Sequence, residues 1–361
     1  MKKVLISNVA LPCKKIGSWT NRITKFLVNN PGQFDFILSP TESPDSQFIF
    51  CKKRRASFSL VSKILRKSPI LASCIDYFQA LDRLSKTKDQ LHLVVIDDLA
   101  LLEGIAIWKS KNLKSHIRLD FSFHGHSFIL PEKWGYLVDR VFFLTHLGYL
   151  DTIRINEVFV PQIHVVGNGT DSSFFYPLSK EEKARKRFEF GYKEQDKVLV
   201  WVSNNRPKKG LNLFLELSKR LSEKYPNLQT LIIGASLPQL PTDSRIKVVG
   251  KIPNNDLPKY LQLGDIYCFT SLWNEGFGLT LIEAAKSGNV VIASQNGGIP
   301  EVVMGLNASF LVKYPNQLSA WEESFEEAWE LAKIYEPNQE VLEKFHPIEV
   351  WEEKFLQALA D

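Results

Sequence analysis

The sequence predicts an α/β protein with two doubly wound parallel sheets, each in its own domain. Three observations support this fold class. The 361 residues are too many for one small core and favour two domains of ordinary size. Short apolar runs rich in β-branched residues alternate with longer segments of helical pattern. Most of the short runs are continuously apolar, which is typical of parallel strands covered on both faces.

Ten of these runs are expected to be strands, and they form two series. In the first half of the chain the strands are KVLISNV, FDFILS, LHLVVID, IRLDFSF and RVFFLT. In the second half they are KVLVWVS, QTLIIGA, IKVVG, DIYCFT and NVVIAS. The N-terminal run is short and interrupted by Ser7 and Asn8, so we expect a buried first strand there and not a signal peptide.

The segment VVGNGTDSSFFYP separates the two series and marks the domain boundary. We therefore predict a first domain at 1–167 and a second at 168–347. The tail, 348–361, is expected to form an amphipathic helix that packs back on the first domain. Two open sheets joined in this way face a cleft. Ligands of such sheets bind beyond the carboxyl ends of the strands, so the loops after the strands are where chemistry is expected.

The charge of the chain is divided unevenly between its halves. Residues 1–167 carry 23 Lys/Arg and 14 Asp/Glu, a balance of +9. Residues 168–361 carry 22 and 26, a balance of −4, and together they give the net charge of +5. A basic half beside an acidic one suggests that the first half faces an anionic partner.

Cysteine usage and hydropathy indicate a cytoplasmic protein. The chain has four scattered cysteines without a C-x-x-C spacing, so neither a disulfide framework nor a metal site is expected. No run of about 18 apolar residues is present, so no membrane-spanning segment is predicted.

The stretch NEGFGLTLIEAAKSG contains the most informative spacing in the chain. Glu275 and Glu283 flank a Gly-Phe-Gly turn that follows the predicted strand DIYCFT and precedes a helix. The amides of Phe277, Gly278, Leu279 and Thr280 would be first-turn donors, which together with the helix dipole form an anion site. Carboxylates instead accept hydrogen bonds from sugar hydroxyls. A phosphate cradle flanked by two glutamates therefore suggests a nucleotide-sugar, with one Glu on the ribose and one on the sugar. The alternative is a solvated pair of acids.

These residues resemble the E-x7-E motif of the retaining glycosyltransferases of family 4, which have the GT-B fold of two Rossmann-like domains facing a cleft. The resemblance covers nearly the whole chain and is strongest from about 160 to 305. It implies that Glu283 binds the ribose hydroxyls and that Glu275 contacts the donor sugar. The segment KVVGKIPNNDLPKYL resembles the one whose backbone holds the nucleobase, which implies that role for Lys251 and Ile252.

The loop in WVSNNRPKKGLNLF resembles the family's diphosphate site. The resemblance implies that Lys209, which stands before Gly210, binds the donor diphosphate. The family's Arg falls on Asn204, which is a departure, and Arg206 lies two residues later where it can reach the same phosphates. The alternative is an exposed basic loop.

Two further loops of the first domain are assigned by resemblance. The resemblance implies that His124, in the HGH sequence at the end of the strand IRLDFSF, contacts the donor sugar near the reacting carbon. His126 is the weaker candidate, and neither has the partners that a metal site needs. Gly17, in the loop after the first strand, matches the glycine that lets the donor approach. Nearby Trp19 either shapes the acceptor pocket or is an ordinary packing residue.

Two acidic and basic features have simpler interpretations. Asp97 and Asp98 follow the strand LHLVVID and are expected to cap a helix. The segment 51–67 has seven Lys/Arg and no acid, with apolar residues between them. It is either a helix that lies on an anionic membrane surface or a solvated surface helix. No nucleic-acid-binding motif accompanies it.

The sequence therefore predicts a retaining glycosyltransferase that transfers a sugar from a nucleotide-diphosphate sugar to an acceptor hydroxyl. A UDP-sugar is favoured over a GDP-sugar, and no metal ion or other cofactor is expected. The acceptor is a glycan or lipid-linked glycan, as in cell-surface polysaccharide or glycolipid assembly. The protein is expected in the cytoplasm, with peripheral binding at the inner face of the membrane. The alternatives are an epimerase or hydrolase of the same fold and a non-catalytic scaffold that binds nucleotide-sugars.

Overall fold

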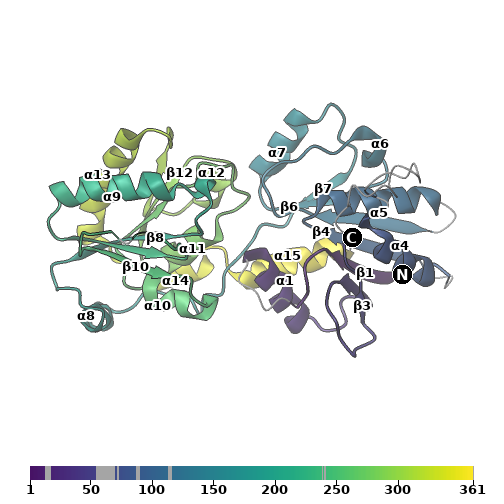
Figure 1. Ribbon diagram of the computed structural model, residues 1–361, viewed down its shortest axis with the longest axis horizontal. Coiled ribbons are helices and arrows are strands. Elements are labelled where there is room, and N and C mark those ends of the chain that lie inside the picture. Colours follow the sequence, from purple (N-terminus) through teal and green to yellow (C-terminus); the bar gives the residue numbers. More distant parts are fainter. Residues whose placement is uncertain are drawn as a thin grey trace. The chain divides into compact units, whose positions relative to one another are not determined.

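The computed structural model describes residues 1–12, 18–53, 70, 73–86, 90–112, 116–237, 239 and 241–360. Contacts divide the described chain into a first unit, residues 1–166, and a second unit, residues 167–360 (Figure 1). Each unit is built on its own parallel sheet.

The first unit contains a sheet with the strand order β3-β2-β1-β4-β5-β6-β7 in its described residues, and every neighbouring pair is parallel. The strands are β1 (Lys2–Ser7), β2 (Phe36–Ser39), β3 (Phe48–Phe50), β4 (Leu91–Ile96), β5 (Ile117–Ser122), β6 (Arg140–Phe143) and β7 (Gln162–Val165). The helices are α1 (Ser18–Asn29), α4 (Ile75–Leu84), α5 (Leu99–Lys111), α6 (Glu132–Gly135) and α7 (His146–Ile155). Because β4 is buried along its whole length, all of its residues except His92 are apolar.

The core of the first unit lies between one face of this sheet and the helices α4 and α5. Buried side chains of α4 and α5, such as Leu81 and Leu102, pack there with Leu93, Val95 and Phe121 of the sheet. The loops that follow the strands emerge from the carboxyl edge of this sheet.

The second unit contains a parallel sheet with the order β10-β9-β8-β11-β12-β13 among the described residues. The strands are β8 (Lys197–Val202), β9 (Leu228–Ile233), β10 (Ile246–Gly250), β11 (Ile266–Phe269), β12 (Val290–Ser294) and β13 (Ser309–Val312). The helical segments are α8 (Lys180–Glu189), η1 (Pro207–Lys209), α9 (Leu211–Lys224), η2 (Asn254–Asp256), α10 (Leu257–Leu261), α11 (Leu279–Lys286), α12 (Ile299–Val302), α13 (Leu318–Ile334), α14 (Gln339–Lys344) and α15 (Ile348–Ala360).

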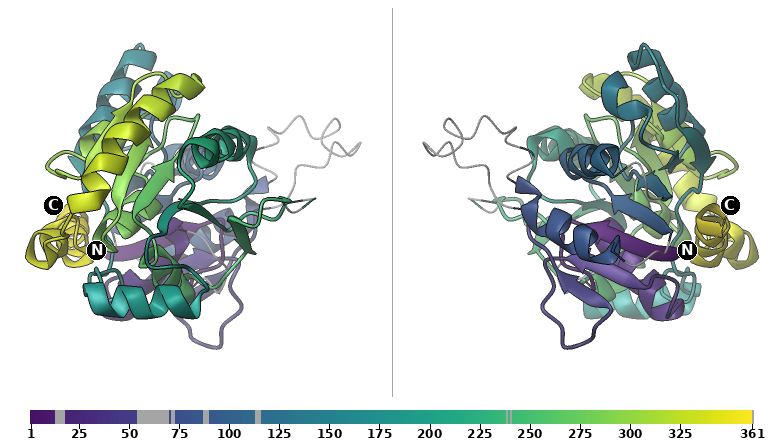
Figure 2. Two further views of the ribbon diagram at one scale, coloured as in Figure 1. Left: turned by 90° about the vertical axis from the view of Figure 1, so that its left-hand side faces the viewer. Right: turned by 90° about the vertical axis from the view of Figure 1, so that its right-hand side faces the viewer.

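Helices cover both faces of the second sheet. Residues of α9 and α13, including Phe214 and Trp321, share one core with Leu199, Trp201 and Ile266 of the strands. In the left view of Figure 2, α9 and α13 lie above these strands and α8 lies below them. The doubly wound architecture predicted for both domains is thus confirmed.

All ten predicted strands are present, together with β3, β7 and β13, which were not predicted. The tail forms α15, whose buried residues include Trp351, Phe355 and Leu359. Contacts assign α15 to the second unit, and its packing on the first domain stays a prediction.

Candidate functional site

The candidate site lies at the carboxyl edge of the second sheet, where the strand order changes direction. From β8 the chain adds β9 and β10 on one side, and it then returns to add β11, β12 and β13 on the other. The loops after β8 and β11 therefore meet at a switch point, which is where doubly wound sheets bind ligands. A hydrogen bond of 2.8 Å from the Leu272 amide to the Lys208 carbonyl joins the two loops.

Two glycines start the helices at this edge. Gly210 precedes α9 with a φ of 72°, and Gly278 precedes α11 with a φ of 79°. These angles lie in the left-handed region, which glycine adopts without steric cost. A Cβ atom at Gly210 would lie only 2.0 Å from the Thr270 carbonyl oxygen. The loop after β8 therefore packs directly against the end of β11.

Gly210→Ala is expected to lower the free energy of unfolding by about 3 kcal/mol or more, because backbone strain and a clash with Thr270 act together. Gly191→Ala is a matched control, since Gly191 has a φ of 75° but its Cβ would meet only the Lys247 Nζ atom, at 3.7 Å. For the control we expect a loss of about 1 kcal/mol. Urea unfolding measures both variants, and equal losses would contradict the proposed clash.

Lys209 and Glu275 form an ion pair between the two loops. The Lys209 Nζ atom lies 2.6 Å from Glu275 Oε1, and the side chains are 20% and 15% exposed. The Ser271 hydroxyl donates to the same carboxylate oxygen. The Gly298 amide donates to the Glu275 carbonyl over 2.8 Å. Gly297 permits this approach, since a Cβ there would lie 2.5 Å from the Glu275 carbonyl oxygen.

The helix α11 adds its first-turn amides and Glu283 to this edge. The amides of residues 277–280 stand at the start of the helix, where no preceding turn supplies a carbonyl acceptor. They can therefore donate to a bound anion. Tyr267 donates from its hydroxyl to Thr280 Oγ1 over 3.0 Å, which fixes the first turn. Burial raises the pKa of Tyr267, and the carboxylates of Glu283 and Glu275 raise it further. Both glutamates of the motif therefore act electrostatically on one buried hydroxyl.

The remaining predicted donor residues lie on more exposed loops. Asn204 Oδ1 accepts a hydrogen bond of 3.1 Å from the Arg206 amide, so the residue that departs from the family pattern stabilises a turn. Both side chains are exposed. Lys251 is exposed and Ile252 is half-buried after β10, which is the edge strand of this sheet. Their contact with a nucleobase stays a prediction.

His124 lies at the carboxyl edge of the first sheet, two residues after the end of β5. Its ring stacks on Trp19, with centroids 5.6 Å apart and an interplanar angle of 30°. The His124 Nε2 atom lies 3.3 Å from Ser122 Oγ. Burial and the nearby positive charge of Arg22 lower the pKa of His124 to about 3. The ring is therefore a neutral hydrogen-bonding group at pH 7.

Neighbouring residues of the first unit have structural contacts. His126 is buried, and its Nε2 atom lies 2.8 Å from Asp151 Oδ2 of α7. Asp98 caps α5, because its Oδ1 atom accepts a 2.8 Å hydrogen bond from the Leu101 amide. The capping prediction is thus confirmed for Asp98 and wrong for Asp97, which accepts a hydrogen bond from the loop after β5 instead.

Two predictions lie wholly or largely outside the described residues. Gly17 is one of them. The other is the basic segment 51–67, of which residues 54–67 lie outside the described residues. Its residue Lys53 is described and forms an ion pair of 2.8 Å with Asp98. Contact of this segment with a membrane surface stays a prediction.

The structure thus brings together Lys209, Glu275 and the first turn of α11, while His124 belongs to the first unit. Sequence reasoning missed two contributors, Ser271 and Tyr267. Ser271 stands four residues before Glu275 at the end of a strand, a position that the sequence does reveal. Tyr267 had no local signal, because its role depends on which face of β11 the helix covers.

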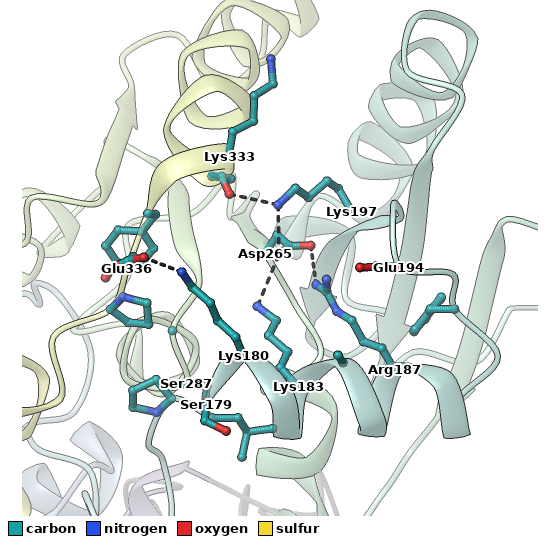
Figure 3. A pocket seen from close by; sticks show the side chains of 18 of the residues that line it. Ser179, Lys180, Lys183, Arg187, Glu194, Lys197, Asp265, Ser287, Lys333 and Glu336 are labelled. Carbon is teal, nitrogen blue, oxygen red and sulfur yellow. Dashed lines mark hydrogen bonds and ion pairs between the residues drawn. The ribbon is translucent and has the colours of Figure 1, made fainter.

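A cavity of about 1150 Å³ lies at the opposite, amino edge of the second sheet (Figure 3). Asp265 is buried there and forms ion pairs with Lys183, Arg187 and Lys197. The same three cations also donate, in that order, to the main-chain carbonyls of Gly264, Leu263 and Ala332. The cluster therefore joins α8, the strand starts and the end of α13, and it is separate from the candidate site.

The described part of the chain shows neither a metal-binding cluster nor a membrane-spanning helix. No group of three or more His, Cys, Asp or Glu side chains is arranged to hold a metal ion among the described residues. Within the same residues, no helix has the length and apolar character that crossing a membrane requires.

Comparison with known proteins finds a family model that matches most of the second unit. Residues 182–340 match the family model of glycosyl transferases group 1. A D-inositol 3-phosphate glycosyltransferase of Corynebacterium efficiens is 30% identical over 166 residues, which is 42% of this chain and 39% of that protein. The putative glycosyltransferase EpsD of Bacillus subtilis is 26% identical over 159 residues, covering 42% and 41%. The matches thus span about two fifths of the length of these curated relatives.

Solved structures resemble the whole chain. Sucrose-phosphate synthase from Thermosynechococcus elongatus superposes with a TM-score of 0.74 at 15% identity, covering 100% of this chain and 98% of that one. HepE from Anabaena, in complex with UDP and glucose, has a TM-score of 0.68 at 15% identity and covers 100% of both chains. At this level of identity the likeness concerns the fold, and it confirms the predicted GT-B fold.

Proposed function

We propose that this chain is a glycosyltransferase of group 1 that acts with retention of configuration and transfers a sugar from a nucleotide-diphosphate sugar to an acceptor hydroxyl. The observation that carries the proposal is the Lys209–Glu275 pair beside the first turn of α11, at the switch point of the second sheet. A cation, free amides and two carboxylates at one edge match the chemistry of a diphosphate joined to two sugars.

Lys209 and the amides of residues 277–280 would hold the diphosphate. In the structure Glu275 is the counterion of Lys209, and a diphosphate would compete for that ammonium group. Donor binding would then release the Glu275 carboxylate to accept hydrogen bonds from the sugar. Lys209 would also stabilise the charge that develops on the diphosphate as it leaves. Arg206 is exposed in the same loop and is proposed as an additional phosphate ligand.

The two ends of the donor are assigned to different residues. Glu283 is proposed to bind the ribose hydroxyls. The backbone at Lys251 and Ile252 is proposed to bind the nucleobase, and a UDP-sugar is favoured over a GDP-sugar. His124, which is neutral at pH 7, would hydrogen-bond the transferred sugar near the reacting carbon. The reaction then proceeds with attack on the face that the diphosphate leaves, without a metal ion and without a protein nucleophile.

The acceptor is proposed to be a glycan or a lipid-linked glycan, in the assembly of cell-surface polysaccharide or glycolipid. The names of the relatives include an inositol phosphate glycosyltransferase and a phosphatidylinositol N-acetylglucosaminyltransferase subunit of Saccharomyces cerevisiae. The excess of basic residues in 1–167 suits an anionic acceptor. We place the protein in the cytoplasm, with peripheral binding to the inner membrane face through 51–67.

The test is binding and slow hydrolysis of a panel of UDP-, GDP- and ADP-sugars, with the anomeric configuration of the product followed by NMR. Selective binding of one UDP-sugar is expected, and Glu283→Ala should weaken it by at least tenfold because the ribose loses its hydrogen-bond acceptor. Glu327→Ala is the control and should bind the donor as the wild type does. Glu327 is exposed on α13, which packs with α9 on one face of the second sheet and is not part of the candidate site.

The outcomes separate the proposal from its alternatives. Turnover that needs no acceptor and isomerises the sugar would favour an epimerase of the same fold, and rapid hydrolysis would favour a hydrolase. Binding without any turnover would indicate a non-catalytic scaffold. A folded protein that binds no sugar nucleotide would rule out the transferase.

A further inference from the structure

The first sheet has a switch point of its own, and Asp97 stands on it. The strand order β3-β2-β1-β4-β5-β6-β7 changes direction between β1 and β4. Asp97 follows β4 directly, and a hydrogen bond of 2.9 Å from Asn8 Nδ2 to Asp98 Oδ2 joins the two loops at this point. A ligand of this unit is therefore expected against the loops that contain Asn8 and Asp97.

The backbone of Asp97 is held in an uncommon conformation. Its φ of 48° is in the left-handed region, which non-glycine residues adopt at a steric cost and mainly as Asp or Asn. Its amide donates to the Ser122 carbonyl over 3.0 Å. Its carboxylate Oδ1 accepts a 2.9 Å hydrogen bond from the His124 amide. The conformation thus turns the carboxylate toward the loop after β5, where the proposed catalytic histidine lies.

The two carboxylates of this loop differ in what they bind. Both carboxylate oxygens of Asp98 accept hydrogen bonds, because Asp98 caps α5 and also binds Asn8 and Lys53. Asp97 is partly exposed, and within the described residues its carboxylate accepts a hydrogen bond at Oδ1 only, from the His124 backbone amide. A conformation that costs free energy and presents a carboxylate oxygen beside a functional residue is typical of binding sites.

The surroundings of the Asp97 carboxylate raise its pKa. Burial raises the pKa of Asp97 to about 6, and the charge of Asp98 adds to the increase, while the His124 amide opposes it. Among the described residues, Lys53 is bound to the neighbouring Asp98, Tyr77 and Cys74 also face Asp98, and Arg22 acts on the neutral His124 ring. Asp97 is therefore ionised at pH 7, with a pKa near that of an effective general base.

We propose that Asp97 Oδ2 binds and orients the attacking hydroxyl, either of the acceptor or of water. The inference rests on the proposed transferase function and extends it to the attacking side of the reaction. As the oxygen of the hydroxyl forms its bond to the anomeric carbon, the bond from that carbon to the diphosphate oxygen breaks. The proton of the hydroxyl passes to Asp97 Oδ2, and the electron pair leaves with the diphosphate.

The experiment compares Asp97→Asn with Asp97→Ala in the hydrolysis of the UDP-sugar that the wild-type protein binds. Asparagine tolerates the left-handed backbone and keeps an oxygen for the His124 amide, so it removes only the charge and the second acceptor oxygen. We expect both variants to lower hydrolysis by at least tenfold while the donor Kd stays within twofold. The wild-type rate should fall below about pH 6, and this fall should be absent in Asp97→Asn.

Each other outcome has a definite meaning. Hydrolysis within threefold of wild type in Asp97→Asn, with a loss in Asp97→Ala, would show that Asp97 only holds the His124 loop and would overturn the proposal. A loss of donor binding in Asp97→Asn would do the same. A wild-type protein that binds no sugar nucleotide would instead overturn the proposed function, and this inference with it.

Discussion

Lys209→Ala is expected to lower donor turnover by about 10²- to 10³-fold. The reason is that the half-buried Lys209 lies beside the start of α11, where the leaving diphosphate would lie, 2.6 Å from its present counterion Glu275. Removing a preorganised charge that stabilises a leaving group has effects of this size in enzymes. Because the ammonium group would also bind the ground-state diphosphate, the variant should bind UDP and the UDP-sugar more weakly as well. Steady-state turnover and calorimetric binding measure the two effects.

Lys208→Ala is the matched control for this prediction. Lys208 is the preceding residue of the same turn, but its Nζ atom lies over the exposed Trp273 ring, 4.7 Å from the centroid. An exposed cation–π contact of this kind contributes little, so turnover should stay within threefold of wild type. Equal losses in the two variants would mean that the turn needs positive charge in general, and would contradict a specific diphosphate contact of Lys209.

Asp265→Asn is expected to reduce the free energy of unfolding by about 3–5 kcal/mol. Asp265 is buried, and it is the carboxylate that compensates Lys183, Arg187 and Lys197 at the amino edge of the second sheet (Figure 3). Removing its charge leaves these cations together in a poorly solvated site, which is costlier than the loss of one hydrogen bond. Urea unfolding at pH 7 gives the measurement.

The pH dependence provides a second test of the same cluster. Burial alone would raise the pKa of Asp265, but Lys183, Arg187 and Lys197 together hold it below its ordinary value. A carboxyl group with a lowered pKa in the folded state stabilises the protein above its unfolded pKa, near 4, and loses this contribution as the pH falls through the folded pKa. The difference between wild type and Asp265→Asn should therefore be constant between about pH 5 and pH 7 and shrink in acid.

Glu336→Gln serves as the control in the same cavity. Glu336 pairs with Lys180 at 2.5 Å, but the two side chains are 73% and 80% exposed. Solvent screens such a pair, so no measurable change in stability is expected. A loss as large as that of Asp265→Asn would indicate that the whole cavity, and not the buried carboxylate, determines the effect.

The strands that the sequence revealed are all the interior ones, together with the edge strand β10. Strands such as β4 and β12 are buried at every position and so appear as mostly apolar runs, with His92 in β4 and Ser294 at the end of β12 as the polar members. The strands that were missed, β3, β7 and β13, all lie at the edges of the sheets. Their side chains are mostly half-buried or exposed. An edge strand has a neighbour on one side only, so its composition carries little of the pattern that identifies a strand.

The candidate site divides in the same way between local and distant information. The Gly-Phe-Gly turn, the helix that follows it and the positions of Glu275 and Glu283 are contiguous, so the 275–283 spacing alone placed them at one helix start. The pairing of Lys209 with Glu275 joins residues 66 positions apart. That pairing depends on β8 lying beside β11, which in turn depends on the order in which the strands assemble.

The sequence by itself determined the two doubly wound sheets and the residue types at the second switch point, because both follow from local periodicity and from turns that only glycine adopts without strain. The tertiary structure alone decided which charges meet. It paired Lys209 with Glu275, gathered three cations around Asp265, and turned Asp97 away from helix capping toward the His124 amide. Coulombic and hydrogen-bonding partners depend on distances across the sheet, and those distances are set when the strands pack together.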